Sequence, residues 1–158
     1  MASSDTSARA RLAVKLGAAT VALLLPLVTQ FEGYSSTVYR DPIGRLAVCW
    51  GHDDQSMNYG QRYTREQCAN LLYADLLKHA SALDCITRPM TDGQRAAFLS
   101  FAYNVGTGAF CKSTLARKAN AGDMDGACAE LSRWTRAGGV VWPGLVKRRA
   151  LERKVCES

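Results

Sequence analysis

Two acidic residues in the first third of the chain have the types and spacing that acid–base chemistry on a sugar needs. Glu32 follows an apolar segment, and Asp41 comes nine positions later at the start of an Asp-Pro-x-Gly turn. Splitting a glycosidic bond takes one carboxylic acid that protonates the leaving oxygen and one carboxylate that activates water or stabilises the cationic sugar. We therefore predict that Glu32 and Asp41 face each other across a shallow cleft.

The residues around these acids make the prediction more specific than a pair of acids alone, since most Glu and Asp side chains are solvated surface charges. The chain reads E-G from Glu32, D-P-x-G from Asp41 and G-H from Gly51. This order resembles the start of the phage-type lysozymes, or endolysins. Their pattern also has a Thr six residues after the Asp, where this chain has Ala47.

The resemblance extends over about residues 30–156 and implies both a fold and an activity. The fold is α+β and lysozyme-like, with a small β-containing N-terminal lobe, a larger helical C-terminal lobe and the active cleft between them. The activity is hydrolysis of the β-1,4 bond between N-acetylmuramic acid and N-acetylglucosamine in bacterial peptidoglycan, for host cell lysis. Glu32 would be the general acid, kept protonated by partial burial, and Asp41 would stay ionised on a wetter turn.

Two further residues have alternative interpretations. Asn104, in the family-like string SFAYNVG, either faces the substrate or satisfies the backbone at a helix end. His52 is expected to make a structural hydrogen bond, and a catalytic base is the alternative. The missing hydroxyl at Ala47 leaves three outcomes: Asp41 positions the water alone, another group replaces the hydroxyl, or water is not the nucleophile.

Two other functions are compatible with the sequence. A lytic transglycosylase would use Glu32 alone and close the sugar on itself without water. A basic protein that binds the wall or disrupts the membrane would lyse cells without any catalytic residue. Cleavage products separate the first alternative from a hydrolase, and dependence of lysis on Glu32 separates the second.

The N-terminus has the composition of a membrane segment. Residues 1–8 are small and polar, which predicts a disordered start. Residues 9–29 combine a basic flank with the weakly apolar run Leu16–Val28, and no A-x-A-like cleavage site follows. This arrangement resembles the signal-arrest-release endolysins, which are first tethered in the host inner membrane and later released into the periplasm. The alternative is a core helix of a soluble domain, and we expect the catalytic domain at 30–158.

Six cysteines indicate disulfides and an oxidising compartment such as the periplasm. No CxxC pair and no zinc-finger spacing occur, so no metal site is expected. Six cysteines allow 15 connectivities, and buried free thiols are the competing interpretation. We expect sequential pairs, because each would bracket one local unit: Cys49 with Cys68, Cys85 with Cys111, and Cys128 with Cys156.

Length and charge limit the remaining possibilities. A chain of 158 residues with 47% hydrophobic content can bury one core, so we expect one catalytic domain. The net charge of +6 favours an anionic wall polymer or membrane surface. No nucleic-acid motif occurs, and aromatic residues do not alternate with basic runs, so no nucleic-acid partner is expected. We also expect a monomer without a cofactor.

Local patterns predict the elements that must position these residues. Strand-forming residues predict strands at Tyr34–Tyr39 and Leu46–Trp50, joined by turn residues at Asp41–Gly44. Capping boxes at Thr64 and Thr91 predict the starts of two helices. Start and stop signals such as Gly122, the Gly138-Gly139 pair and Pro143 predict three more helices, at Ser113–Gly122, Gly126–Arg136 and Gly144–Val155.

Overall fold

A computed structural model describes residues 2–158 of the chain, with side chains from residue 8 onward. The chain divides into two compact units, each built from two separate segments. Unit 1 contains the chain up to Lys15 together with Glu32–Lys78, and unit 2 contains Leu16–Phe31 together with His79–Ser158. The chain therefore passes from unit 1 to unit 2 and back before it reaches the first predicted strand.

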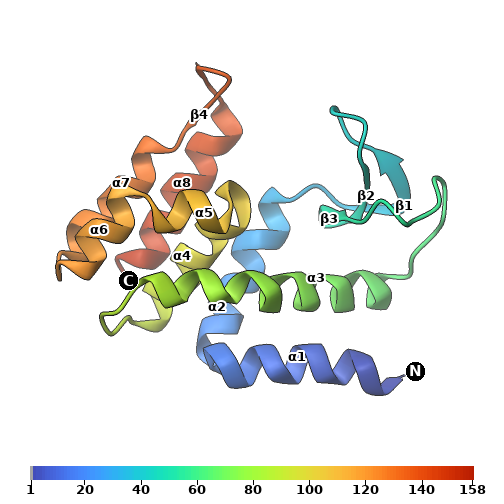
Figure 1. Ribbon diagram of the computed structural model, residues 1–158, viewed down its shortest axis with the longest axis horizontal. Coiled ribbons are helices and arrows are strands. Elements are labelled where there is room, and N and C mark those ends of the chain that lie inside the picture. Colours follow the sequence, from blue (N-terminus) through green and yellow to red (C-terminus); the bar gives the residue numbers. More distant parts are fainter. Residues whose placement is uncertain (1) are drawn as a thin grey trace. The chain divides into compact units, whose positions relative to one another are not determined.

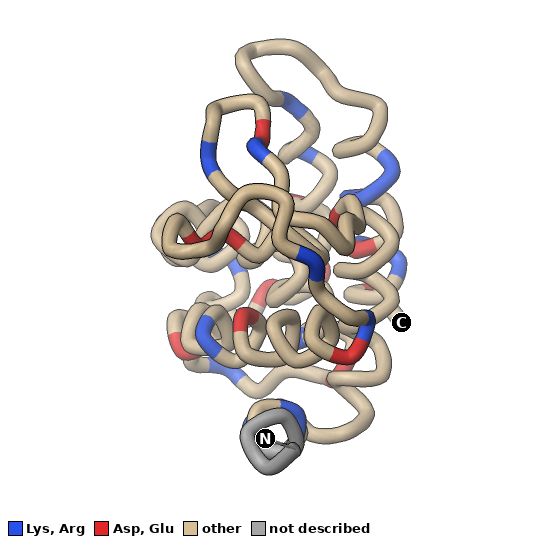
Figure 2. Tube along the Cα trace, turned by 90° about the vertical axis from the view of Figure 1, so that its right-hand side faces the viewer, with Lys and Arg blue, Asp and Glu red and all other residues tan. Residues whose placement is uncertain are grey.

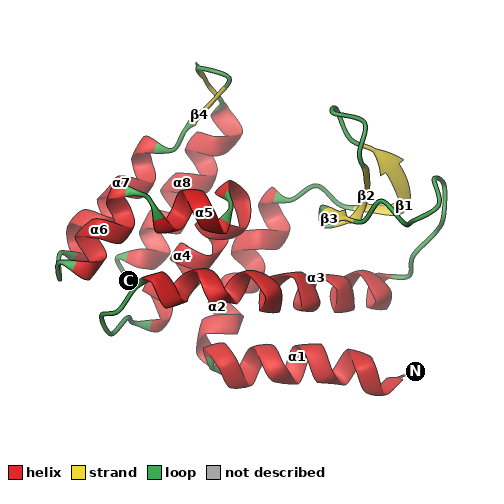
Figure 3. Ribbon diagram, viewed as in Figure 1, coloured by secondary structure: helices red, strands yellow, loops and turns green. Residues whose placement is uncertain are grey.

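Unit 1 combines a small sheet with two long helices (Figure 1). The sheet is antiparallel throughout, with the strand order β1-β2-β3. Its strands are the only ones drawn in this part of the chain, and helices make up most of the rest of the described residues (Figure 3). The elements of unit 1 are α1 (Ala2–Leu16), β1 (Ser35–Arg40), β2 (Leu46–Cys49), β3 (His52–Asp53) and α3 (Arg65–His79).

The sheet confirms the two predicted strands to within one residue. β1 is rich in β-branched and aromatic residues, which suit a half-buried pleated surface. β2 is buried at every position, because it lies between β1 and β3. The predicted turn at Asp41–Gly44 joins the first two strands. The small β lobe that the sequence predicts is thus present.

Helix α3 begins at the capping box that the sequence predicts. The Gln67 backbone N–H donates to the Thr64 hydroxyl at 3.1 Å, and the Thr64 N–H donates to the Gln67 side chain at 2.8 Å. Two of the unpaired N–H groups at the helix start are satisfied in this way. One turn into the helix, Cys68 forms a disulfide with Cys49, whose Cα lies 5.1 Å away. The end of β2 is therefore covalently attached to α3.

Unit 2 is mostly helical. Its central helix is α4, which packs against α2 and α8. The Thr91–Gln94 capping box that the sequence predicts is present at the start of α4. The elements are α2 (Ala18–Phe31), η1 (Ala80–Cys85), α4 (Asp92–Val105), α5 (Thr107–Cys111), α6 (Thr114–Asn120), α7 (Met124–Glu130), η2 (Leu131–Arg133), β4 (Arg136–Ala137), β5 (Val140–Val141) and α8 (Pro143–Cys156).

An aromatic cluster forms the centre of unit 2. The ring of Phe101 lies edge-on to Trp134 at 5.0 Å between centroids and to Phe110 at 6.1 Å. Phe98 completes the cluster at 6.2 Å from Phe110. All three phenylalanines are fully buried. Such contacts stabilise a core beyond the area that they bury, by roughly 0.5–1.5 kcal/mol per pair.

Two arginines of α8 are buried, although basic side chains are mostly exposed in proteins. Arg148 and Arg149 both pair with Glu152, which comes four and three residues later in the same helix. The Ser100 hydroxyl of α4 donates to the same carboxylate at 2.7 Å. Removing one partner of such a buried group strands the other charge, so the cluster fixes how α8 packs on α4.

The helix that we predicted at Gly126–Arg136 is wrong in its last turn. The helical conformation ends at Arg133, and a short hairpin of β4 and β5 follows. The two residues between these strands are Gly138 and Gly139, both with positive φ. A two-residue loop with positive φ at both positions is typical of tight hairpins, and Gly-Gly is among its preferred sequences. The Gly-Gly pair that was expected only to break the helix instead forms the loop of a hairpin, which begins at Arg136.

All three predicted disulfides are present, and no described cysteine is free. In unit 2, Cys85 pairs with Cys111 and Cys128 pairs with Cys156, with Cα–Cα distances of 5.6 and 5.7 Å. Their sequence separations of 26 and 28 residues correspond to roughly 3–4 kcal/mol each from the reduced entropy of the unfolded chain. Cross-links of this size matter in a chain with a modest core.

The N-terminal segment is divided in two at Gly17, which has a φ of 86°. Among the described residues no single helix is long and apolar enough to cross a bilayer, and Ala8–Leu16 with Ala18–Phe31 satisfy the test only together, as a bent pair. The signal-anchor predicted at 9–29 is therefore not confirmed by the structure. The disordered start was predicted at residues 1–8. Met1 and the side chains of residues 2–7 lie outside the described residues, and α1 begins at Ala2. The disordered start therefore stays a prediction.

Candidate active site

Glu32 follows the last residue of α2 directly and is partly buried. Its Oε2 lies beside Gly51, only 3.4 Å from the position that a Cβ on that residue would occupy. Gly51 also has a φ of 76°, a conformation that side chains rarely adopt. The backbone conformation thus favours glycine next to the acid, while a Cβ at this position would only reach van der Waals contact with it.

The segment containing Gly51 is held on both sides by α3. Cys49, which itself has a positive φ of 61°, is bonded to Cys68. On the other side, the Nδ1–H of His52 donates to the Asp75 carboxylate, at 2.9 Å to Oδ2 and 3.1 Å to Oδ1. The strained turn beside Glu32 is therefore fixed by one covalent and one charge-assisted link.

Asp41 shapes the turn between β1 and β2 with its own side chain. Its Oδ1 accepts the backbone N–H groups of Ile43 at 3.0 Å and Arg45 at 2.9 Å. Backbone bonds between Asp41 and the residues Gly44 and Arg45 close the turn. Among the described residues Oδ2 has no hydrogen-bond donor, so one carboxylate oxygen holds the turn and the other is available to a ligand.

A second polar network fixes the Asp41 turn from the β3 side. The Arg45 guanidinium forms a bidentate pair with Asp53, at 2.7 and 3.1 Å. This pairing lowers the pKa of the Asp53 carboxyl and raises the pKa of Arg45. Gln55 bonds to both the N–H and the C=O of Leu46, at 3.0 and 3.2 Å. The start of β2 is thus clamped close to the catalytic candidate.

An aromatic pair is formed by residues close in the chain to Glu32 and to Gly51. The rings of Tyr34 and Trp50 are 4.8 Å apart, and the guanidinium of Arg65 lies over both, at 4.5 and 4.9 Å. Cation–π contacts of this kind contribute about 0.5–1 kcal/mol at exposed sites. Since Trp50 precedes Gly51, the stack further restrains the residue that contacts the acid.

Ala47 occupies the middle of β2, where it is buried and pairs with Tyr39 of β1 and Asp53 of β3. Its methyl group provides no hydroxyl at this position. The structure thus retains the Asp41 turn while the side chain that accompanies it in the family pattern is missing.

The structure brings most of the predicted site residues into unit 1, namely Glu32, Asp41, Ala47 and His52. Asn104 lies in unit 2, where its Oδ1 accepts a hydrogen bond from Arg149, so its substrate-binding role stays a prediction. The expected structural role of His52 is confirmed by its bond to Asp75.

Four positioning residues were missed by reasoning from the sequence: Arg45, Asp53, Gln55 and Asp75. The polar run after Gly51-His52 was a usable signal for two of them, whereas Asp75 comes 23 residues after His52 and had none. Among residues 8–158 no group of three His, Cys, Asp or Glu side chains could hold a metal ion.

Comparison with known proteins gives consistent matches. The phage lysozyme family matches residues 29–152 of the chain. The SAR-endolysin of Enterobacteria phage PA-2 is 40% identical over 157 residues, which cover 95% of each protein. The SAR-endolysin of Bacteriophage PS119 is 45% identical over 126 residues, covering 79% of this chain and 75% of its own.

Solved structures with the same fold include the muramidase domain of SpmX from Asticaccaulis excentricus. It aligns with a TM-score of 0.80 at 31% identity, over 90% of this chain and 97% of that domain. The active form of the P1 phage endolysin Lyz aligns with a TM-score of 0.78 over 98% of this chain and 92% of its own. At 24% identity the second match shows the fold alone.

The His52–Asp75 pair predicts a pH-dependent stability. The hydrogen bond that His52 donates to the Asp75 carboxylate raises the pKa of His52 above its ordinary value of 6.5, against the effect of partial burial. A raised folded-state pKa means that the pair stabilises fully below the unfolded pKa and loses its effect as pH rises through the folded pKa. We expect Asp75→Asn to lower the melting temperature most at about pH 5.5 and progressively less at higher pH.

The matched control is Asp84→Asn, because Asp84 is exposed and has no ion pair among the described residues. The change in melting temperature that Asp84→Asn causes should be the same at about pH 5.5 and at higher pH. If Asp75→Asn lowers the melting temperature by the same amount from about pH 5.5 to 9, the charge of the carboxylate does not contribute and only its packing does.

Proposed function

This chain belongs to the phage lysozyme family, and from that premise we propose that it is an endolysin that cleaves the β-1,4 bond between N-acetylmuramic acid and N-acetylglucosamine. We infer that it acts as a monomer on peptidoglycan and not on nucleic acid. The observation that carries the proposal is the position of the Glu32 carboxyl beside Gly51, in the unit that also contains the Asp41 turn.

In the proposed reaction, Glu32 protonates the leaving glycosidic oxygen while Asp41 remains ionised. The two carboxyls have different surroundings, as this division of labour requires. Both are partly buried, but Glu32 follows the end of a helix, whereas Asp41 lies on a turn where one of its oxygens accepts two backbone N–H groups. Asp41 Oδ2 would orient the attacking water or stabilise the cationic sugar.

Substitution of the acid tests the assignment. We expect Glu32→Gln to lower peptidoglycan hydrolysis by about 100- to 10,000-fold, because the amide keeps the shape but delivers no proton. Asp41→Asn should cost less. Turbidity of a cell-wall suspension measures the rate, and circular dichroism checks the fold.

Glu66→Gln is the control, since Glu66 is an exposed acid of the same unit outside the proposed site. Near-normal clearing of cell walls by Glu32→Gln would refute the role of Glu32. It would favour instead a basic protein that lyses cells without cleaving glycan.

The buried methyl of Ala47 raises the question of how water is held. We propose that Asp41, with another group in place of the missing hydroxyl, positions the water on the sugar face opposite Glu32. A transglycosylase would have no evident need for the Asp-Pro-x-Gly turn that this chain keeps. Inverting hydrolysis requires the two carboxyls to stand roughly 6.5–9.5 Å apart, which leaves room for the water.

Product analysis tests this mechanism. We expect reducing-end products of inverted configuration, detected by NMR during early turnover and by mass spectrometry. Ala47→Thr should be tolerated or mildly activating, because it restores a hydroxyl in β2 at the cost of a crowded, buried position. Products that end in a 1,6-anhydro sugar would exclude the hydrolase and leave Glu32 as the acid of a transglycosylase.

We also propose that residues 9–29 tether the enzyme in the host inner membrane and that release delivers it to the periplasm. The relatives named SAR-endolysin support this, because matches such as that from phage PA-2 extend over 95% of the chain. The basic residues Arg9, Arg11 and Lys15 would keep the N-terminus cytoplasmic.

The packing of α2 within unit 2 supports a released form in which this helix lies in the protein core and not in the membrane. The Thr20 hydroxyl is fully buried, donates to Asp92 at 2.8 Å and accepts from Arg95 at 3.2 Å. The bond from Thr20 is the largest cause that lowers the pKa of the Asp92 carboxyl. In a bilayer this hydroxyl would lose both partners, and α4 and α8 would lack the helix on which they pack. The tethered enzyme is therefore expected to be inactive.

A pair of substitutions tests release without disturbing the packed form. Ala18 and Ala19 are exposed in the structure, so Ala18→Leu/Ala19→Leu adds preference for lipid, about 0.5 kcal/mol per residue, and removes no contact. We expect delayed lysis and more enzyme in the membrane fraction. The control Ala109→Leu/Ala150→Leu changes exposed alanines outside the segment. Lysis on the normal schedule by Ala18→Leu/Ala19→Leu would contradict control by tethering.

A further inference from the structure

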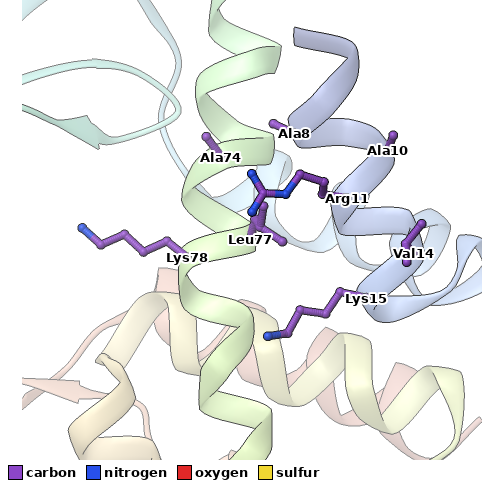
Figure 4. Close-up of a pocket in the computed structure, with 8 residues that line it drawn as sticks. All are labelled: Ala8, Ala10, Arg11, Val14, Lys15, Ala74, Leu77 and Lys78. Carbon is purple, nitrogen blue, oxygen red and sulfur yellow. The ribbon is translucent and has the colours of Figure 1, made fainter. Parts of the chain in front are cut away.

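Helices α1 and α3 of unit 1 line an open groove that the proposed active site does not use (Figure 4). Its volume is about 920 Å³, enough to take a small amphiphilic molecule. The guanidinium of Arg9 lies 5.8 Å from the ring centre of Tyr73 and helps to hold the two helices together. The lining residues are Ala8, Ala10, Arg11, Val14, Lys15, Ala74, Leu77 and Lys78.

The lining combines positive charge with small apolar side chains. Three of its eight residues are cationic and none is acidic. Arg11 and Lys15 extend from α1 toward α3, whereas Lys78 extends from the other side of α3 (Figure 4). Among residues 8–158 neither Arg11 nor Lys15 has an ion-pair partner. Basic residues occur elsewhere in both units (Figure 2), but this groove adds an apolar floor to them.

The apolar part of the lining is unusually accessible. Val14, on the α1 side, is 88% exposed, the highest value among the exposed large hydrophobic residues. Leu77 extends from α3 toward α1 (Figure 4), and Ala74 of α3 also lines the groove. A soluble anion such as a wall carboxylate would engage the cations and leave these groups in water. An anionic molecule with an alkyl chain would engage both.

We propose that this groove binds an anionic phospholipid, with the phosphate near Arg11 and Lys15 and the first part of an acyl chain along Val14 and Leu77. The proposal rests on the proposed release from the membrane for the source of the lipid. Because the groove needs both helices, a bound lipid stabilises the packing of α1 on α3 by mass action. The released enzyme would thereby keep a lipid partner through the segment that had tethered it.

The probe is dihexanoylphosphatidylglycerol, kept below the concentration at which it forms micelles and titrated into the full chain by NMR or calorimetry. Glycerol phosphate tests the headgroup alone, dihexanoylphosphatidylcholine tests an alkyl chain without net charge, and soluble peptidoglycan fragments test the wall polymer. We expect saturable binding of phosphatidylglycerol and a raised melting temperature, with at least tenfold weaker binding of the other three. Equal affinity for any of these controls would overturn the proposal.

Two variants test the site. Ala74→Trp fills the groove from α3 without changing the charge or the segment proposed to enter the membrane, and it should remove binding. Arg11→Gln/Lys15→Gln should weaken binding about 25-fold, since each cation near an anionic lipid contributes roughly fivefold. The control Lys112→Gln/Arg117→Gln removes the same charge from exposed residues of unit 2 and should bind normally.

Wild-type affinity in Ala74→Trp or in Arg11→Gln/Lys15→Gln would refute the groove as the site. Hydrolysis of peptidoglycan by Ala74→Trp should remain normal, because Ala74 lies outside the proposed catalytic residues. If the lipid proposal fails, peptidoglycan hydrolysis is still expected to depend on Glu32. If the proposed function fails, Glu32→Gln will clear cell walls normally, and the measurement of lipid binding will not be affected.

Discussion

The packing of α2 against α4 and α8 is the contact on which the rest of the structure depends, because Glu32 follows α2 directly in the chain. Glu32 itself begins the second segment of unit 1, where its Oε2 lies beside Gly51. Gly51 is in turn held by the Cys49–Cys68 disulfide and the His52–Asp75 pair. The proposed catalytic acid thus lies beside a turn that is held by elements with no proposed chemistry of their own.

The same helix has to satisfy two environments in the proposed life of the protein. Leu24, Leu27 and Val28 supply apolar surface that both a bilayer and a protein core accept. Thr20 has partners only in the packed form, where Asp92 and Arg95 satisfy its hydroxyl. If the segment also enters the membrane as proposed, substitutions that change its preference for lipid would shift the balance between the two states.

Unit 2 uses strong local restraints to receive this helix. Its two disulfides shorten the unfolded chain, and the Arg148–Glu152–Arg149 cluster gives α8 one orientation on α4. A buried ion cluster is weak support for stability in general, since desolvation offsets its attraction. Here the Ser100 hydroxyl and the carbonyl of Trp134 also pair with the cluster, which limits the desolvation cost.

Short-range chemistry determined what the sequence alone could predict. The Asp41 turn, the two strands beside it and both capping boxes depend on residues within a few positions of one another. The sequential disulfides were also predictable, because each closes a neighbouring stretch of the chain. The order of acids and glycines was enough to identify Glu32 and Asp41 as candidates.

Only the tertiary structure decided the features that depend on distant partners. Burial of Arg148 and Arg149 requires Glu152 and α4 in place, and periodicity cannot distinguish that face from a solvated one. The hairpin after Arg133 depends on strand pairing, which competes with a helical pattern of similar strength. The groove between α1 and α3 exists only once two segments about sixty residues apart pack together, because side-chain packing, unlike a turn or a cap, is not encoded by neighbouring residues.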